Sequence, residues 1–324
     1  MKTKLVYVIV SDENDFYLEQ TYVSMSSARN FMTDVFIVLV MDTKTAGNLK
    51  GFRKIEAEYA NEIIVVDLDP SFPAKKRSRL LKTSLRNVVD GDFLYIDSDT
   101  LVVRDLSEAD SFDFSLGAVL DRHTSLDSNP FLGCISPDLD TLGVVVKDDI
   151  YHNSGVIYAK DNQETREFFK RWNEHYLEGY LSGVTADQPA LARTVCETNL
   201  MSLLDETWNC QISSGLRYAR NARIWHYFSS NEVYFLNNPE SLMQIRKQER
   251  IPDNILSLFE NPFLGFPNLC QIISGKELEF YASREFSNLR HLISRNTFVG
   301  KLIKSILRIN ERYYLMKKSF LKSK

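Results

Sequence analysis

The sequence predicts an α/β fold with a mainly parallel, twisted sheet flanked by helices. Short apolar, β-favouring runs alternate with helical patterns over the first hundred residues. Such alternation is typical of βαβ units, in which consecutive strands run parallel. With 324 residues, the chain is long enough for one large domain or two smaller ones.

The predicted elements follow one another regularly in the first part of the chain. We expect strands at residues 4–10, 34–41, 61–68, 93–103 and 115–120, and helices at 17–31, 46–60 and 77–89. The segment 121–149 is expected to be irregular, because it contains two prolines, two glycines and several aspartates. A long loop of this kind beside a site often binds substrate or acts as a lid.

The second half continues the alternation and then changes character. A polar edge at Tyr151 leads into a strand that reaches Tyr158, a helix is expected at 163–177, and another opens near Pro189. We therefore expect three parts: an α/β domain with the candidate site over 1–235, a part of unassigned structure over 236–289, and a basic helical extension over 290–324.

Composition favours a globular protein of the cytoplasm. Hydrophobic residues make up 44% of the chain and charged residues 25%. The four cysteines lack metal-site or disulfide spacing, so reduced thiols are expected. No apolar run is long enough to span a bilayer, and the apolar part of the first ten residues is too short for a leader peptide. Those residues are therefore expected to form the first strand.

Asp97 and Asp99 stand two residues apart inside the apolar run 93–103. Side chains alternate along a strand, so both carboxylates are expected to project the same way, and Ser98 the other. Two neighbouring carboxylates repel one another, and a divalent cation relieves that repulsion. Because Asp and Ser also favour turns, a plain turn at the strand end is the alternative interpretation.

Further polar motifs occur at predicted element ends. They are Ser11-Asp12, Asn153-Ser154-Gly155-Val156, Asp187-Gln188 and His226. In parallel sheets, ligands bind beyond the carboxyl ends of the strands. With Asp97-Ser98-Asp99, the last three of these motifs resemble, in order and spacing over residues 4 to about 230, glycosyltransferase family 8 and related nucleotide-sugar transferases. The resemblance implies the GT-A fold, which is Rossmann-like.

The resemblance implies a metal site and a donor site. Asp97, Asp99 and His226 would bind Mn²⁺ or Mg²⁺, and this donor set suits Mn²⁺ better than Ca²⁺. For His226, the alternative is a histidine packed in an aromatic cluster. The residues expected to contact the UDP-sugar donor are Asp12, Asn14, Arg79, Ser98 and Asp121. Lys82 and Arg86 compete with Arg79 for this function, because they lie near the same helix face.

Three residues match those that line the transferred sugar in the family: Asn153, Asp187 and Gln188. Glutamine is a poor nucleophile, so the resemblance implies a retaining reaction along a front-face path. The alternative for Asp187 and Gln188 is a helix N-cap and first turn. One departure concerns the residues after His226. In family members, the matching histidine is commonly followed by Gly and then Lys-Pro-Trp. Here no lysine closely follows it.

The C-terminal extension is strongly basic. Residues 290–324 contain ten Lys or Arg and one acidic residue, Glu311, so the preceding body is acidic. From Val299 to Tyr313, apolar residues recur at spacings of three and four, with basic residues on the opposite face. Such a helix suits an anionic membrane surface. A helix that packs on the domain with a solvated basic face is the alternative, and no nucleic-acid partner is expected.

Together with these observations, the resemblance implies a metal-dependent, retaining transferase. It would move a hexose from a UDP-sugar to a saccharide or lipid-linked saccharide, in the synthesis of a cell-surface polysaccharide, lipopolysaccharide or glycoconjugate. One alternative is a sugar-nucleotide nucleotidyltransferase, which usually has a glycine-rich loop after the first strand, whereas residues 11–14 contain no glycine. The other is a non-catalytic relative that binds a saccharide or a protein partner.

Overall fold

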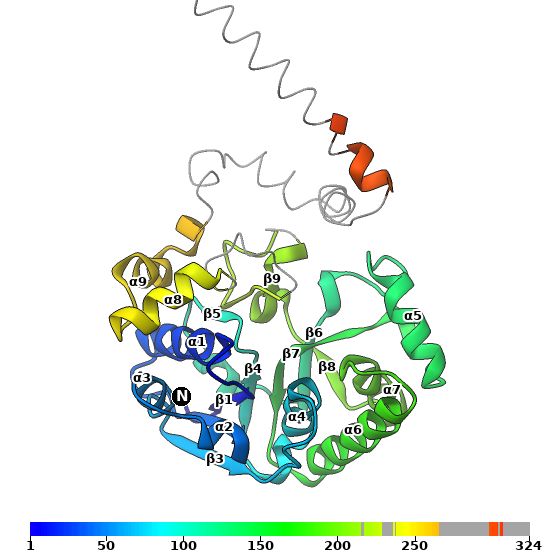
Figure 1. The fold of residues 1–324 in the computed structure, drawn as a ribbon. Coiled ribbons are helices and arrows are strands. Elements are labelled where there is room, and N and C mark those ends of the chain that lie inside the picture. Colours follow the sequence, from blue (N-terminus) through cyan, green and yellow to red (C-terminus); the bar gives the residue numbers. More distant parts are fainter. Residues whose placement is uncertain (215–216, 229–235, 237, 266–297, 304, 307–324) are drawn as a thin grey trace, which may run out of the picture.

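The computed structural model describes residues 1–214, 217–228, 236, 238–265, 298–303 and 305–306 (Figure 1). Its strands are β1 (Lys4–Ile9), β2 (Ile37–Asp42), β3 (Glu62–Val66), β4 (Phe93–Ile96), β5 (Thr100–Val102), β6 (Leu116–Leu120), β7 (His152–Ala159), β8 (Met201–Leu203), β9 (Cys210–Gln211) and β10 (Ile224–His226). Its helices are α1 (Tyr17–Phe31), α2 (Thr43–Gly47), α3 (Phe52–Ala57), α4 (Ala74–Thr83), α5 (Leu132–Thr141), α6 (Gln163–Leu181), α7 (Gln188–Thr198), α8 (Pro239–Gln248) and α9 (Asp253–Glu260).

A seven-stranded sheet in the order β3-β2-β1-β4-β7-β6-β8 forms the centre of the fold. The strands β3, β2, β1 and β4 run parallel to one another, and β8 runs parallel to β6, whereas β7 is antiparallel to both β4 and β6. The prediction of a mainly parallel α/β sheet is therefore confirmed. Because β7 runs against β4, its first residues lie beside the last residues of β4.

Alternate residues of the central strands pack against different helices. Leu5, Tyr7 and Ile9 of β1 belong to a cluster with residues of α1. Val6 and Val8 belong to a second cluster, which contains residues of α4, α6 and α7. The sheet is thus covered on both faces, as expected for parallel strands that are apolar throughout.

A small sheet, in the order β5-β10-β9, stands beside the large one. It corrects the prediction of one continuous strand over 93–103. Strand β4 ends at Ile96, and the chain resumes as β5, which pairs antiparallel with β10. Asp97 and Asp99 therefore lie in the turn between two sheets, and not along one strand.

Two other predictions were wrong. The helix expected at 46–60 is divided into α2 and α3, because Gly51 adopts a left-handed φ of 55° directly before α3 begins. The segment 121–149 is only partly irregular, since it contains α5. Leu139 of α5 packs in a cluster with Tyr151 and Ala192, and this apolar contact stabilises a helix despite Pro137 in its interior.

Helices α8 and α9 lie beside α1 (Figure 1). Leu242 and Ile245 of α8, and Ile255 and Leu258 of α9, belong to an apolar cluster that also contains Val23 of α1. The predicted division at residues 235 and 290 stays a prediction. Most of the predicted C-terminal extension lies outside the described residues, and its described part, 298–303 and 305–306, is helical. None of the described helices is long and apolar enough to cross a membrane.

Candidate active site

A cleft of about 750 Å³ opens at the edge of the large sheet where β1 and β4 end. Its walls come from β1, α1, α4, the turn after β4, the start of β7, the start of α7, and the residues at the end of β10. Strand β7 contributes because it runs antiparallel to β4, which brings residues 153–155 to this edge. The cleft lies where a parallel sheet is expected to bind a ligand.

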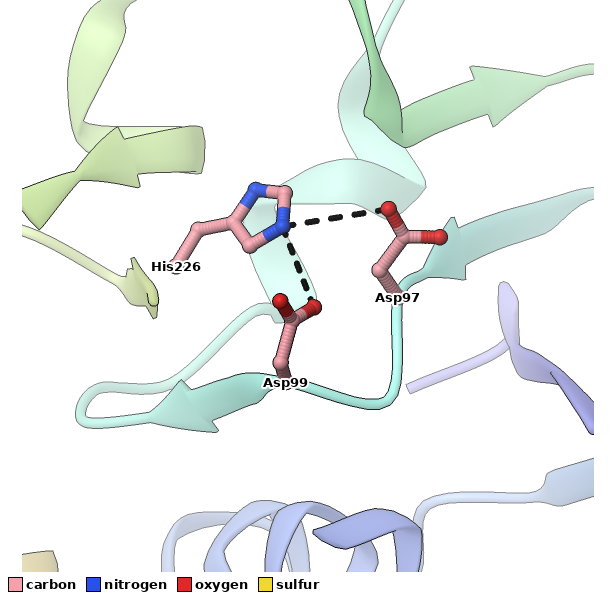
Figure 2. A group of neighbouring side chains, drawn as sticks. All are labelled: Asp97, Asp99 and His226. Carbon is pink, nitrogen blue, oxygen red and sulfur yellow. Dashed lines mark ion pairs between the residues drawn. The ribbon is translucent and has the colours of Figure 1, made fainter. Parts of the chain in front are cut away.

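Asp97, Asp99 and His226 meet at the wall of this cleft (Figure 2). Nε2 of His226 lies 3.2 Å from Oδ1 of Asp99 and 3.8 Å from Oδ2 of Asp97. One ligand atom from each residue can be chosen so that all three lie within 4.8 Å of one another. The ring is 1% exposed, while both carboxylates are partly exposed towards the cleft.

The small sheet positions the histidine. His226 pairs with Thr100 across β10 and β5, and the backbone N–H of Tyr227 donates to the carbonyl oxygen of Asp99 at 2.9 Å. On the other side, the N–H of Asp97 donates to the carbonyl of Gly155 at 2.8 Å. Backbone hydrogen bonds therefore join the Asp97–Asp99 turn both to the large sheet and to the small one.

A stripe of buried hydroxyl groups on α1 supports the same turn through hydrogen bonds. The hydroxyl of Thr21 donates to that of Ser98 at 2.9 Å, and the hydroxyls of Ser24 and Thr100 lie 2.8 Å apart. The hydroxyl of Thr100 in turn donates to the carbonyl of Asp97 at 2.8 Å. Ser98, which was expected to contact the donor, lines the cleft and also takes part in this support.

Burial and His226 have opposite effects on the carboxyl group of Asp99. Removal from water favours the neutral acid, whereas His226 favours the anion, and on balance the pKa of Asp99 is lowered. At Asp97, Oδ1 accepts a short hydrogen bond from the hydroxyl of Tyr95 and lies 3.4 Å from Nζ of Lys82. Its second oxygen, Oδ2, is the one that faces His226.

Asp187 lies in the cleft as the partner of two cations. Its carboxylate is 2.8 Å from Nε of Arg79 and 3.2 Å from Nζ of Lys82. Burial works to raise the pKa of Asp187, but the two cations outweigh it and hold the pKa well below its usual range. Asp187 is the N-cap residue of α7 and Gln188 begins the first turn, as in the alternative interpretation, but the side chain of Asp187 makes no capping hydrogen bond.

Asn153 and Gln188 also line the cleft. The amide oxygen of Gln188 accepts from the N–H of Ser154 at 3.3 Å, and that of Asn153 accepts from the N–H of Gly155 at 2.9 Å. The three residues matched to the transferred sugar are thus brought to one cleft with the acidic turn.

Three of the predicted donor contacts do not line the cleft. Asp12 and Asn14 lie in the loop between β1 and α1, where Oδ1 of Asp12 accepts from the N–H of Asn14 at 2.8 Å. Asp121 is 5% exposed and accepts hydrogen bonds from Asn153 and Asn129 at 2.9 and 2.8 Å. Their contact with a donor stays a prediction.

The structure distinguishes among the three basic residues expected near one helix face, because Arg79 and Lys82 lie on α4 whereas Arg86 lies in the 3-10 turn Leu85–Asn87 that follows it. Arg79 and Lys82 line the cleft, whereas the guanidinium of Arg86 donates to the carbonyls of Val89 and Gly91. Lys82 was weighed only as a competitor, although its spacing of three from Arg79 places it one turn further along the same face. Asn209, which contacts His226, was not anticipated, and no pattern in its short 3-10 segment marks it.

Comparisons with known proteins agree with this architecture. No family model matches the sequence, and no curated protein sequence matches it. The structure is similar to galactosyltransferase LgtC, solved in complex with donor and acceptor sugar analogues, with a TM-score of 0.50 and 17% identity over 79% of this chain and 99% of that chain.

Two further solved structures match less well. Mouse xyloside xylosyltransferase 1 has a TM-score of 0.47 and 13% identity, over 71% of this chain and 98% of that chain. Glycosyltransferase GlyE of Streptococcus pneumoniae has a TM-score of 0.46 and 17% identity, over 82% of this chain and 65% of that chain. The similarity to LgtC, together with the mainly parallel sheet, shows that this chain has the GT-A fold.

Proposed function

We propose that this protein is a metal-dependent, retaining glycosyltransferase that moves a hexose from a UDP-sugar to a saccharide or lipid-linked saccharide acceptor. The observation that carries the proposal is the convergence of Asp97, Asp99 and His226 on one cleft with Asp187 and Gln188. A role in the synthesis of a cell-surface polysaccharide, lipopolysaccharide or glycoconjugate follows from such acceptors.

The three proposed ligands fit Mn²⁺ or Mg²⁺. Two carboxylates and one imidazole form a mixed oxygen and nitrogen donor set, which suits Mn²⁺ in particular. Gly155 has no side chain to occupy the space beside His226 and Asp97, so the three ligands can face one another. When bound, the cation would offset the negative charge that develops on the departing UDP.

Arg79 and Lys82 determine what Asp187 can do. A carboxylate held by two cations is a weak nucleophile but remains a good acceptor of hydrogen bonds. We therefore assign Asp187 to orienting a hydroxyl of the transferred sugar. Gln188, whose neutral amide is a poor nucleophile, and Asn153 line the same space, which supports a front-face reaction without a covalent intermediate.

The test is a thermal-shift screen of nucleotides and nucleotide-sugars, with and without Mn²⁺. A ligand that binds only the folded state raises the melting temperature. We expect UDP or a UDP-sugar to do so only with Mn²⁺, and Asp99→Asn to abolish this shift. Asp113→Asn is the matched control, because Asp113 does not line the cleft. The proposal would be wrong if no nucleotide stabilised the protein, or if UDP stabilised it equally in EDTA.

We further propose a cytoplasmic protein that binds the inner face of the membrane peripherally. In the helical residues 298–303 and 305–306, Phe298 is 83% exposed, and Val299, Leu302 and Ile306 are at least half exposed. Lys301 is also exposed there, and such a mixture suits an anionic interface. Sedimentation with anionic vesicles should pellet the wild-type chain but not Phe298→Glu. Equal binding of both proteins would contradict this function of the segment.

A further inference from the structure

A chain of hydrogen bonds between buried side chains leads from Asp121 to the imidazole of His226. Nδ2 of Asn153 donates to Oδ1 of Asp121 at 2.9 Å, and Nδ2 of Asn209 donates to Oδ1 of Asn153 at 2.9 Å. Oδ1 of Asn209 lies 2.9 Å from Nδ1 of His226. All four residues are at most 5% exposed, so water cannot easily replace any of these bonds.

The donor and acceptor groups of the four side chains set the direction of each of these hydrogen bonds. An ionised carboxylate only accepts, so the atom of Asn153 that faces Asp121 is its NH₂ group. A second group fixes the same orientation independently, because the backbone N–H of Gly155 only donates and faces the other end of the Asn153 amide at 2.9 Å. The oxygen of Asn153 therefore faces Asn209, which must present its own NH₂ group.

The orientation of the Asn209 amide determines which ring nitrogen of His226 carries a proton. With its NH₂ group directed at Asn153, Asn209 presents its oxygen to His226, and an amide oxygen only accepts. Nδ1 of His226 must therefore carry a proton. In the neutral ring the lone pair then resides on Nε2, the atom that faces Asp97 and Asp99. A metal ion binds to such a lone pair.

We propose that Asn209 is a positioning residue that fixes neutral His226 as the Nδ1–H tautomer, with Asn153 and Asp121 orienting Asn209 in turn. The consequence for a metal rests on the proposed function, whereas the tautomer itself does not. Asn209 comes from the segment between β8 and β9, 56 residues from Asn153 and 17 from His226. Asn209 would not bind the metal itself and would act through the imidazole ring that it orients.

The sharpest test is the tautomer itself. In protein with ¹⁵N-labelled histidine side chains, two-bond nitrogen–proton correlations show which ring nitrogen carries the proton. The measurement uses the metal-free chain at a pH well above the usual range of histidine titration. We expect His226 to carry its proton on Nδ1 in the wild type. A wild-type spectrum with the proton on Nε2 would overturn the proposal, whatever the variants do.

Two variants separate positioning from packing. Asn209→Ala removes the acceptor and should move the proton of His226 partly or wholly to Nε2. Asn209→Asp keeps an acceptor at this position and should retain the Nδ1–H form. His175, whose Nδ1 lies 3.0 Å from the hydroxyl of Thr194 and outside these hydrogen bonds, serves as an internal control because its signals should not change. If Asn209→Ala kept the wild-type tautomer, Asn209 would have no such function.

Calorimetric titration with Mn²⁺ connects the tautomer to the metal. Loss of a partner that orients a metal-bound histidine commonly weakens binding about 10- to 100-fold, and we expect a loss of this size for Asn209→Ala and a smaller one for Asn209→Asp. If the wild type bound no Mn²⁺, the proposed function would fail while the spectrum still tested the tautomer. If Mn²⁺ bound equally well to Asn209→Ala, the positioning proposal would fail alone.

Discussion

Gly155 lies so close to the ring of His226 that a Cβ atom built on it would stand 2.2 Å from Cε1 of the imidazole. The same Cβ would lie 2.8 Å from Oδ2 of Asp97. Gly155 is not in a left-handed conformation, so the requirement for glycine comes from space alone. The strand β7 therefore approaches the proposed metal ligands with its backbone.

Gly155→Ala should displace His226 and Asp97 and weaken Mn²⁺ binding. Overpacking of this kind typically costs about 1–3 kcal/mol, which corresponds to a loss of affinity of roughly tenfold or more if it falls on the ligands. Titration with Mn²⁺ measures the loss, and a melting curve measures the stability. Gly133→Ala is the control, since no atom lies within 4 Å of its Cβ position. Unchanged Mn²⁺ affinity in Gly155→Ala would contradict the prediction.

The fold was largely predictable because its strands are apolar on both faces. Strand β1 and helix α1 were placed within a residue of their observed ends, since β-favouring runs and a polar loop delimit them clearly. The break after Ile96 was not predicted. Apolar residues continue on both sides of it, so the sequence pattern does not show that β5 leaves the large sheet to pair with β10. The point at which one strand ends and the next begins is set here by pairing with a distant strand.

The site was predictable where its residues stand in motifs and not where single side chains support them. Asp97, Asp99 and His226 were expected together, and they lie together. Asn209 and the hydroxyl stripe of α1 act through contacts across the fold, between residues 56 to 77 positions apart. Such contacts leave no local sequence pattern, because asparagine and serine are also common in turns and helix caps.

Lys82→Met should tighten Mn²⁺ binding and weaken donor binding. The ammonium group lies 3.4 Å from Asp97 and 3.2 Å from Asp187, so it repels a cation but attracts a diphosphate. The full Coulomb energy at short range is about 4 kcal/mol. Because Lys82 is already paired with Asp97 and Asp187, only part of that energy is gained or lost, and changes of about tenfold, or about 1.4 kcal/mol, in opposite directions are expected. Calorimetry with Mn²⁺, and then with UDP, measures both. Lys76→Met on the same helix is the control, and a parallel loss of both affinities would contradict the prediction.

Arg246 of α8 holds the loop between β1 and α1. Its guanidinium pairs with the buried carboxylate of Glu19 and donates to the carbonyl oxygens of Glu13 and Asp15. Val10 and Tyr17, near the two ends of this loop, line the cleft. Arg246 therefore connects α8 to the side of the cleft where the nucleoside is expected.

Arg246→Lys should keep the ion pair with Glu19 but lose the planar fork that reaches both carbonyls. We expect faster hydrogen exchange of the amides of residues 12–16 and UDP binding weaker by about fivefold, with Mn²⁺ affinity unchanged. Arg250→Lys, at an exposed pair with Asp253, is the matched control. Exchange at the wild-type rate would show that Arg246 does not hold the loop.

Glu56 of α3 should make the protein less stable as the pH rises. It is fully buried, and neither of its carboxyl oxygens has a hydrogen-bond partner within the described part of the chain. Burial is the largest cause that raises its pKa from 4.5 to about 8, and Glu19 adds to it, while Arg53 and Arg246 oppose it. The folded state therefore keeps a proton that the unfolded state loses between these two pH values.

Because the unfolded state binds fewer protons in that range, the free energy of unfolding should fall by up to about 1.4 kcal/mol per pH unit between roughly pH 5 and 8. Glu56→Gln replaces the buried acid by a neutral amide of the same shape and should remove this slope. Urea denaturation at a series of pH values measures the slope in both proteins. Glu58→Gln, on the exposed end of the same segment, should keep it. Equal slopes in the wild type and Glu56→Gln would mean that Glu56 is already ionised in the folded protein.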